Sequence, residues 1–499
     1  MTKKISLFVL SALYVFLTLA LPARANIDYM VNQSAEYFRT LSRNASIDSA
    51  DIINYNPAGT VFMKDGIHTN ISNQFVPMLN YEIKYDGDTY GSEKPVWLLP
   101  NVYVAWKKGN FAIFGSFTVP AGGGSVAYKD GIPMMPLYNS LVKEEGIKSI
   151  QAMAVDGILE DPLATGILGL NTTDPVEILH FVEDNIDLNG TTVNWLGGEV
   201  NASSMYLAGT AGVATRLFKS MSLSVGIRYM YAKNTYSGYS SYEVDPVAVN
   251  DGGGLVGNGV EDAVNAEANV VERVELDATK TAMGFGFIVG FDWQIFDNLR
   301  LGARFEEATV LKFTENVKPG KDFAGMFVDG RKSRYDLPMM IGLGVSYDPL
   351  SFLTVTGSTN IYFVNLADTA NDDYDDVGGY DDDYSVPFDL SLGIEYRPWK
   401  FLSVSLGYQF SYTSGSNKTY NDLDFALNSH AIGGGVRYTP WEFLSFTLGG
   451  NYVISQPGKD ATGVEKFNKY IAAFAFGVEY RYLTDSSGQS TDMDLRRRR

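Results

Sequence analysis

The stretch FLSVSLGYQFSY, residues 401–412, alternates apolar side chains with small or polar ones. Its odd positions from residue 403 onward hold serine, glycine and glutamine, whereas its even positions hold Leu402, Val404, Leu406, Tyr408, Phe410 and Tyr412. Successive side chains of a β-strand point to opposite faces, so this period of two predicts a strand with one apolar face and one polar or small face. Residues 388–397 and 470–482 repeat the pattern.

Short connections of one type join several of these strands. The sequences YDPLSFLTVTG, YRPWKFLSVSLG and YTPWEFLSFTLG begin at Tyr347, Tyr396 and Tyr438. Each is a strand end, a proline turn and a Phe-Leu pair that opens the next strand, and proline is tolerated because the turn needs no ladder donor. These short connections alternate with long polar ones. The alternation predicts fourteen strands, at about 66–77, 98–107, 110–119, 203–217, 222–240, 272–295, 299–315, 334–347, 352–366, 384–397, 401–415, 427–439, 443–456 and 467–482.

An apolar strand face can pack on a second sheet, as in a soluble sandwich, or it can face lipid, as in a membrane barrel. Aromatic residues gather at the strand ends, where membrane barrels carry their interface girdles, and the even strand number suits a bacterial barrel. A sandwich of simple hairpins does not explain the alternation of short and long connections. We therefore predict an all-β, fourteen-stranded antiparallel outer-membrane barrel over residues 66–482.

Both chain ends differ from this repetitive part. Lys3 and Lys4 precede an uncharged apolar run over residues 5–21, and Ala23-Arg24-Ala25 follows. This order predicts a secretory signal peptide over residues 1–25, although an N-terminal membrane anchor is the alternative. Residues 483–499 are polar, end in four arginines, and are interpreted as a tail beyond the last strand.

Composition excludes several classes of function. The net charge of −19 argues against a nucleic-acid partner, and the lack of cysteine excludes disulfides and thiolate metal sites. His68, His180 and His430 are the only histidines, and none has metal-ligand spacing or lies beside a nucleophile motif. We expect no enzymatic activity, no cofactor and no metal site, and a monomer in contact with outer-membrane lipid and lipopolysaccharide.

Residues 26–65 precede the first strand and contain NYNPAGTVF at 54–62, which has neither a helical nor a strand period. A fourteen-stranded barrel encloses a lumen too wide for wall side chains to fill, because about eight strands already leave little spare room. The segment is therefore predicted to fold inward as a plug, with a fixed turn at Asn56, Pro57 and Ala58. The alternative is a mobile leader outside the barrel.

The stretch DSADIINYNPAG, residues 48–59, resembles the signature of the FadL family of outer-membrane transporters. In that family an Asn-Pro-Ala turn lies in an N-terminal hatch inside a fourteen-stranded barrel, and Asn56, Pro57 and Ala58 match it. The resemblance implies capture of a long-chain fatty acid or an aromatic hydrocarbon among outer loops, binding above the hatch, and lateral exit through the wall at a kinked strand. A non-selective aqueous porin is the first alternative function, and a surface adhesin or structural barrel is the second.

The strand predicted at 110–119 runs into a proline and three glycines, which weaken a ladder. We interpret Val119, Pro120, Ala121, Gly122 and Gly123 as a kink or the start of a binding groove, although the strand could simply end there. The loop at about 120–202 shows helical spacing, and Pro175 follows Asp174, a suitable helix N-cap. Candidate contacts to a hydrophobic ligand are Phe117, Met134, Met135, Leu137, Leu141 and Met153.

Charged residues also occur on the inward-facing side of the predicted strands. They could pair with a fatty-acid carboxylate or brace the lumen as a lattice of ion pairs, and the lattice is the commoner arrangement. They are Arg228, Arg304, Arg397, Arg437, Glu395 and Glu479. The acidic run over residues 371–384 reads as a solvated outer loop, with Ca²⁺ binding as the alternative.

Overall fold

The computed structural model describes residues 33–135, 155, 159, 174–187, 192–245, 249–250, 270–323, 327–367, 385–423 and 425–484. Several sequence predictions fall outside these residues. They are the signal peptide at 1–25, the ligand candidates Leu137, Leu141 and Met153, the acidic run at 371–384 and nearly all of the C-terminal tail.

Fourteen antiparallel strands close into one barrel, because each pairs with its neighbour and the first, β1, also pairs with the last, β20. The strand count predicted from the sequence is confirmed. The wall strands, in order, are β1 (Gly66–Tyr85), β3 (Val96–Lys108), β4 (Phe111–Tyr128), β6 (Thr192–Phe218), β7 (Met221–Asp245), β9 (Val270–Phe296), β10 (Leu299–Glu306), β13 (Met339–Leu350), β14 (Leu353–Phe363), β15 (Phe388–Trp399), β16 (Leu402–Tyr412), β17 (Ser429–Trp441), β18 (Leu444–Ser455) and β20 (Lys466–Leu483).

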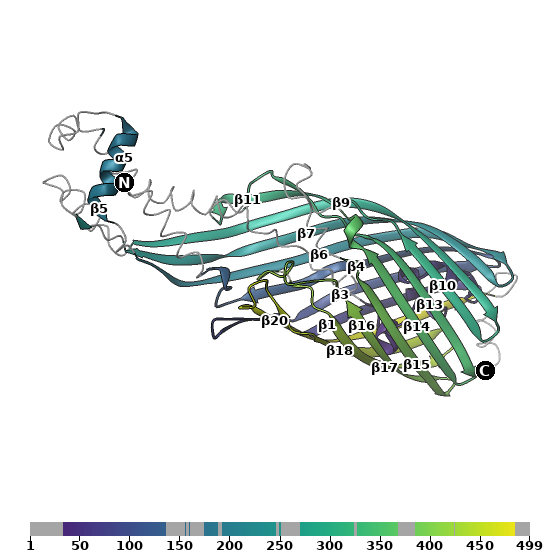
Figure 1. The fold of residues 1–499 in the computed structure, drawn as a ribbon. Coiled ribbons are helices and arrows are strands. Elements are labelled where there is room, and N and C mark those ends of the chain that lie inside the picture. Colours follow the sequence, from purple (N-terminus) through teal and green to yellow (C-terminus); the bar gives the residue numbers. More distant parts are fainter. Residues whose placement is uncertain are drawn as a thin grey trace.

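Short turns join the wall strands at one end of the barrel, and longer segments join them at the other. β6, β7 and β9 extend beyond the other strands at the long-segment end (Figure 1). Helix α5 (Pro175–Asn185) begins where the sequence predicts, with the Val176 N–H donating to Asp174 Oδ1 at 3.0 Å. The remaining elements are β2 (Asp88–Glu93), β5 (Ile186–Asp187), β8 (Val249–Asn250), β11 (Lys312–Asp322), β12 (Lys332–Arg334), η3 (Val364–Leu366) and β19 (Gly458–Lys459).

Several strand predictions differ from the structure. The strands predicted at 66–77, 110–119 and 203–217 are longer, and the strand predicted at 334–347 covers the end of β12, a break and most of β13. The segment predicted as a single strand at 299–315 is two strands, β10 and β11, separated near Thr309. There the chain leaves the wall and packs over the lumen face of β9, where a Cβ on Gly286 would lie 2.7 Å from Thr309 Oγ1. The glycine surface of β9 therefore lets the chain move inward, and the strand is interrupted.

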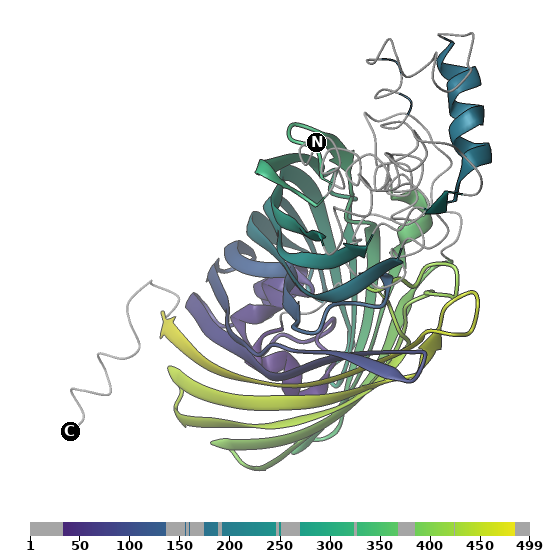
Figure 2. The ribbon, with the colours of Figure 1, turned by 90° about the vertical axis from the view of Figure 1, so that its left-hand side faces the viewer.

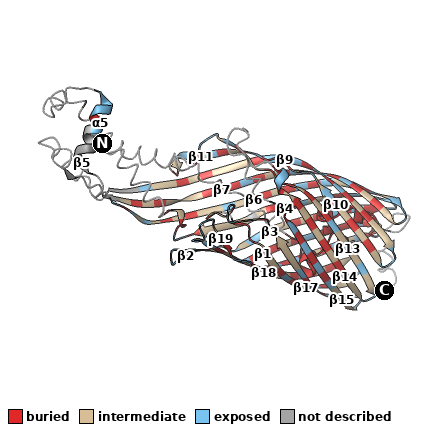
Figure 3. Ribbon diagram, viewed as in Figure 1, coloured by how far each residue is buried: buried red, intermediate tan, exposed pale blue. Residues whose placement is uncertain are grey.

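The barrel exposes its apolar side chains and buries its polar ones. On β15, Leu390, Leu392 and Ile394 are exposed, whereas Asp389 and Ser391 are buried. Figure 3 shows the same alternation along the other strands. This is the reverse of a soluble protein and matches a wall with hydrocarbon outside and a polar lumen inside. Within the described residues, no helix is long and apolar enough to cross a membrane.

Aromatic residues surround the short turns. Trp399 stacks on Phe401 with ring centroids 5.9 Å apart, and Trp441 stacks on Phe443 at 5.7 Å. All four lie at the strand ends, and both tryptophans are exposed. Amphipathic rings at the edge of an apolar band are typical of a membrane–water interface.

Residues 33–63, called the inner segment below, lie inside the barrel (Figure 2). The inner segment contains α2 (Ala35–Thr40), η1 (Ala50–Asn54) and η2 (Pro57–Phe62). Ser34 caps α2 by accepting the Tyr37 N–H at 3.1 Å. Helix α2 contacts β15 to β18 and β20, while η1 and η2 contact the wall from β3 to β9, so the segment spans the lumen.

Glycines on the lumen face allow the inner segment to lie directly on the wall. A Cβ on Gly393 would be 2.5 Å from the Thr40 carbonyl oxygen, and one on Gly449 would be 2.8 Å from Phe38 Cβ. Real Cβ atoms do not approach this closely. The small face that the sequence shows on these strands is therefore the surface on which the inner segment packs.

We expect Gly393→Ala to destabilise the folded barrel by about 1–3 kcal/mol, because the new methyl group overpacks the contact with Thr40. Gly357→Ala is the matched control, since its Cβ would be 3.3 Å from Val345 Cγ1, a side-chain atom on the lipid face that can move. Urea unfolding in lipid vesicles measures both. Equal stability of the two variants would contradict the direct contact.

Candidate functional site

The turn predicted at Asn56, Pro57 and Ala58 lies fully inside the barrel. Asn56 caps η2 by accepting the Ala58 N–H at 3.3 Å, and Pro57 occupies the first turn of η2. The Asn56 amide donates to the Asn44 carbonyl at 3.2 Å and to the Phe291 carbonyl of β9 at 3.0 Å. One side chain thus fixes the turn, the inner segment around it and the wall.

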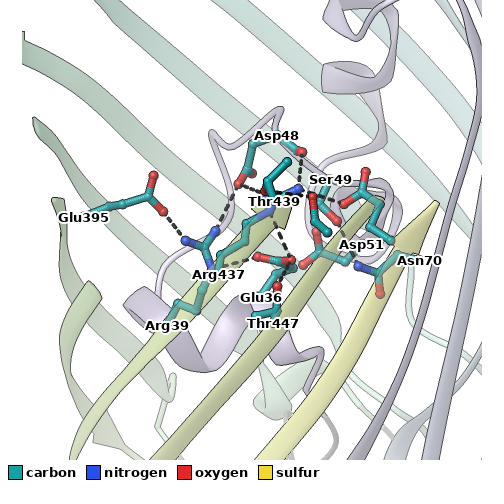
Figure 4. A network of polar contacts seen from close by, with 12 residues as sticks. Glu36, Arg39, Asp48, Ser49, Asp51, Asn70, Glu395, Arg437, Thr439 and Thr447 are labelled. Carbon is teal, nitrogen blue, oxygen red and sulfur yellow. Dashed lines mark hydrogen bonds and ion pairs between the residues drawn. The ribbon is translucent and has the colours of Figure 1, made fainter. Parts of the chain in front are cut away.

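A network of charged side chains joins the other half of the inner segment to the wall (Figure 4). Arg39 of α2 lies 2.7 Å from Glu36 and 3.0 Å from Asp48, and it also pairs with Glu395 of β15. Arg437 of β17 lies 2.7 Å from Asp48 and 3.1 Å from Glu479. The inner segment and three wall strands therefore share one set of ion pairs.

Asp48 is the point where three guanidinium groups meet. Burial acts to raise its pKa, but Arg43, Arg437 and Arg39 together outweigh burial and hold the pKa well below the usual value of a carboxyl group. Asp48 faces a cavity of about 380 Å³ at the short-turn end, which Arg300 and Arg397 also line. The carboxylate is therefore ionised and acts as an electrostatic anchor.

The lumen charges singled out in the sequence also form ion pairs. Arg228 of β7 lies 3.2 Å from Glu306, Arg304 pairs with the same carboxylate, and Arg397 lies 2.8 Å from Glu395. Together with the pair between Arg437 and Glu479, these contacts agree with a lattice that braces the lumen.

Above the inner segment lies a cavity of about 150 Å³, called the central cavity below. Tyr37 and Phe38 of α2 contribute to its lining from below. Its apolar lining comes from Val76, Leu79, Val96, Ala431, Val453, Ile471 and Ala473, and its polar lining includes Gln33, Gln74, Tyr362, Asp389, Gln409, Ser411 and Asn451. A space of this kind, apolar with a few polar groups, is the usual form of a small-molecule site.

The wall is interrupted beside the central cavity. The ladder between β3 and β4 runs from Lys108 and Phe111 to Val102 and Phe117, and the two strands do not pair beyond it. On its other side β4 shifts register twice against β6, at residues 118–121 and 122–125. Gly122 has a left-handed φ of 68°, which a glycine adopts readily.

Beyond this interruption β4 turns toward the lumen. Val119 is buried in a cluster with Leu79, Leu99 and Tyr37, and Gly124 lines the central cavity. The upper part of β3, residues 96–101, thus has one edge that does not pair with β4. An unpaired strand edge is costly in hydrocarbon, and this edge begins at Val96, which lines the central cavity.

The other predicted site residues lie in different places. Pro120 and Ala121 line a second cavity of about 50 Å³ with Arg228, Arg304 and Tyr362. Phe117 is exposed on the outside of the barrel, at the last position of β4 that pairs with β3. Met135 is buried in an upper apolar cluster with Tyr128 and Phe425, and the structure does not place Phe117, Met134 or Met135 in the lining of the central cavity.

Sequence reasoning missed most residues that line the central cavity. Tyr37, Leu79 and Tyr362 come from three distant parts of the chain, and no local pattern marks them. Asp389 could have been predicted as a lumen residue, because it is an acidic residue at an inward position of the regular alternation in 388–397. The upper cluster was also missed, since loop residues such as Phe327 and Phe425 form it with the wall.

Fold and lumen together define a class of protein: a membrane β-barrel whose pore is occupied by its own N-terminal residues and whose wall is interrupted beside an internal cavity. The sequence matches no protein-family model and no curated protein. The fold is that of FadL-type barrels. The chain is similar to the Pseudomonas putida toluene transporter TodX, with 11% identity over 92% of this chain and 100% of that chain and a TM-score of 0.57.

Two further solved structures share the fold. The Ralstonia pickettii toluene transporter TbuX has 12% identity over 91% of this chain and 99% of that chain, with a TM-score of 0.55. A Pseudomonas aeruginosa FadL homologue has 14% identity over the same shares of the two chains, with a TM-score of 0.53. At these identities the likeness establishes the fold.

We expect Arg437→Met to lower the free energy of unfolding by about 3 kcal/mol, because it leaves the fully buried Glu479 and the cavity-facing Asp48 each without one cationic partner. Arg397→Met is the control, since Arg397 is about one-third exposed and its ion pairs are screened, so its loss costs about 1 kcal/mol or less. Urea titrations in vesicles compare them. An equal effect of both changes would show that the network is not an anchor.

Proposed function

We propose that this protein carries small hydrophobic molecules across the bacterial outer membrane. The molecule is captured at the long-segment end, occupies the central cavity above the inner segment, and leaves sideways between β3 and β4. The interruption of the wall beside the cavity is the observation that carries this proposal. The shared fold with solved toluene transporters supports it.

The size of the central cavity bears on the cargo. A cavity of about 150 Å³ lined by apolar side chains accommodates benzene in another protein. The central cavity has a similar volume, about 150 Å³, so it suits a single aromatic ring better than an extended acyl chain. Removing apolar surface from water supplies roughly 25 cal/mol per Å², enough to draw such a ring from solution. Of the two cargo classes, fatty acids and aromatic hydrocarbons, the second is favoured.

The arrangement in the membrane follows from the two ends of the barrel. We place the short turns, with their tryptophan belt, on the periplasmic side and the long segments outside, facing lipopolysaccharide. In this arrangement residues 1–25 direct export, residues 26–65 act as the hatch, and the protein works as a monomer.

Lateral exit can be tested by closing the wall. The chain has no cysteine, so Leu99→Cys with Val119→Cys introduces a unique thiol pair on opposite sides of the interruption. A short bis-maleimide link should lower the uptake of radiolabelled toluene by cells several-fold, because the two strands can no longer separate around the cargo.

Val104→Cys with Gly115→Cys is the control pair, because these positions are already partners in the ladder. Linking them should leave uptake unchanged. Full uptake after a Leu99–Val119 link verified by mass spectrometry would refute exit through this part of the wall.

A non-selective aqueous porin is disfavoured because the inner segment spans the lumen. In planar bilayers we expect the intact protein to show no steady ion conductance, and a variant lacking residues 26–65 to conduct as an open pore. The deletion variant must first refold to a heat-modifiable barrel on electrophoresis. A porin-sized conductance from the intact protein would instead favour the porin.

A further inference from the structure

Asp389 is an acidic residue in the otherwise largely apolar and uncharged lining of the central cavity. Its carboxyl group is 8% exposed and lines the cavity beside Gln409 and Ser411. The Tyr362 hydroxyl donates to Asp389 Oδ2 at 3.0 Å. A donated hydrogen bond favours the ionised form of a carboxyl group, whereas burial opposes it. An acidic group therefore lies in the wall of the proposed cargo site.

The described residues that line the cavity include no lysine, arginine or histidine that could pair with this carboxyl group. Arg228 and Arg304 line a separate cavity beyond Tyr362, where both pair with Glu306. Lys469 of β20 lies over the ring of Tyr81, 4.9 Å from its centroid, and it does not line the central cavity. The cations near the site are thus held by other partners.

We infer that Asp389 is ionised in the central cavity and is a specificity-determining residue that excludes anionic cargo, so that the cavity accepts neutral aromatic molecules and rejects aromatic and aliphatic carboxylates. This inference rests on the proposed function. A carboxylate entering the cavity would lose its hydration and face a like charge at close range, and the lining offers no cationic partner in return. A neutral ring of the same size has no charge to dehydrate and is not repelled by Asp389.

The test uses three probes that share one ring: toluene, 4-methylbenzamide and 4-methylbenzoate. The last two match in size and differ in charge. The full chain in lipid nanodiscs should bind toluene and the amide, and bind the carboxylate at least about tenfold more weakly than the amide, as measured by calorimetry. Asp389→Asn should remove most of that difference by strengthening carboxylate binding relative to amide binding.

Two variants complete the design. Asp389→Glu retains the charge and should keep the exclusion, which separates charge from any general disturbance of the cavity. Asp292→Asn is the control, because Asp292 is a fully buried lumen carboxylate that pairs with Arg300 away from the cavity. It should leave the ratio of amide to carboxylate affinity unchanged.

The outcomes are distinguishable. If the unaltered protein binds amide and carboxylate equally, or if Asp389→Asn leaves their ratio unchanged while toluene binds, the charge filter is wrong and the proposed transport function stands. If none of the three probes binds, the proposed function fails and the filter fails with it.

Discussion

The width of the barrel is the constraint on which the rest of the structure depends. Fourteen strands enclose more space than wall side chains can fill, so the lumen needs a second layer of protein. The inner segment supplies that layer by laying its backbone against glycines of the wall, as Thr40 does at Gly393. The same packing leaves room above α2, and this room is the central cavity.

When the inner segment fills a polar lumen, charged side chains of the segment and of the wall also become buried together. Inward-facing arginines and carboxylates are costly to bury unless each finds a partner. In the lower lumen, Asp48 faces three guanidinium groups, and Arg437 binds carboxylates from both the inner segment and the wall. The central cavity differs, because Asp389 is bound by hydroxyl and amide groups there and no cation among the described residues lines the space with it. The ion pairs that brace the lumen and the proposed cargo site therefore lie at separate levels of the lumen.

The barrel could be predicted from sequence because its pattern is local. The alternation in 401–412 and the repeated proline turns define strands within a few residues. The number of strands then follows from the regular spacing of these turns. The break between β10 and β11 could not be predicted, because it depends on glycines of β9 that are distant in sequence. The central cavity was missed for the same reason, since Tyr37, Leu79 and Asp389 meet only after the barrel closes. Phe117 shows the opposite error: it lies near the interruption in sequence but faces outward.

The inner segment contacts the wall on both sides of the interrupted seam. Its η1 and η2 turns touch β3 and β4, while α2 and its ion pairs hold β15, β17 and β20 across the barrel. A cylinder with a slit in its side normally loses its resistance to deformation, because tension can no longer pass around the ring. A strut across the inside restores that resistance. The covalent connection at Gly66 makes this strut part of the same chain, so the barrel can keep an opening in its side and still hold its shape.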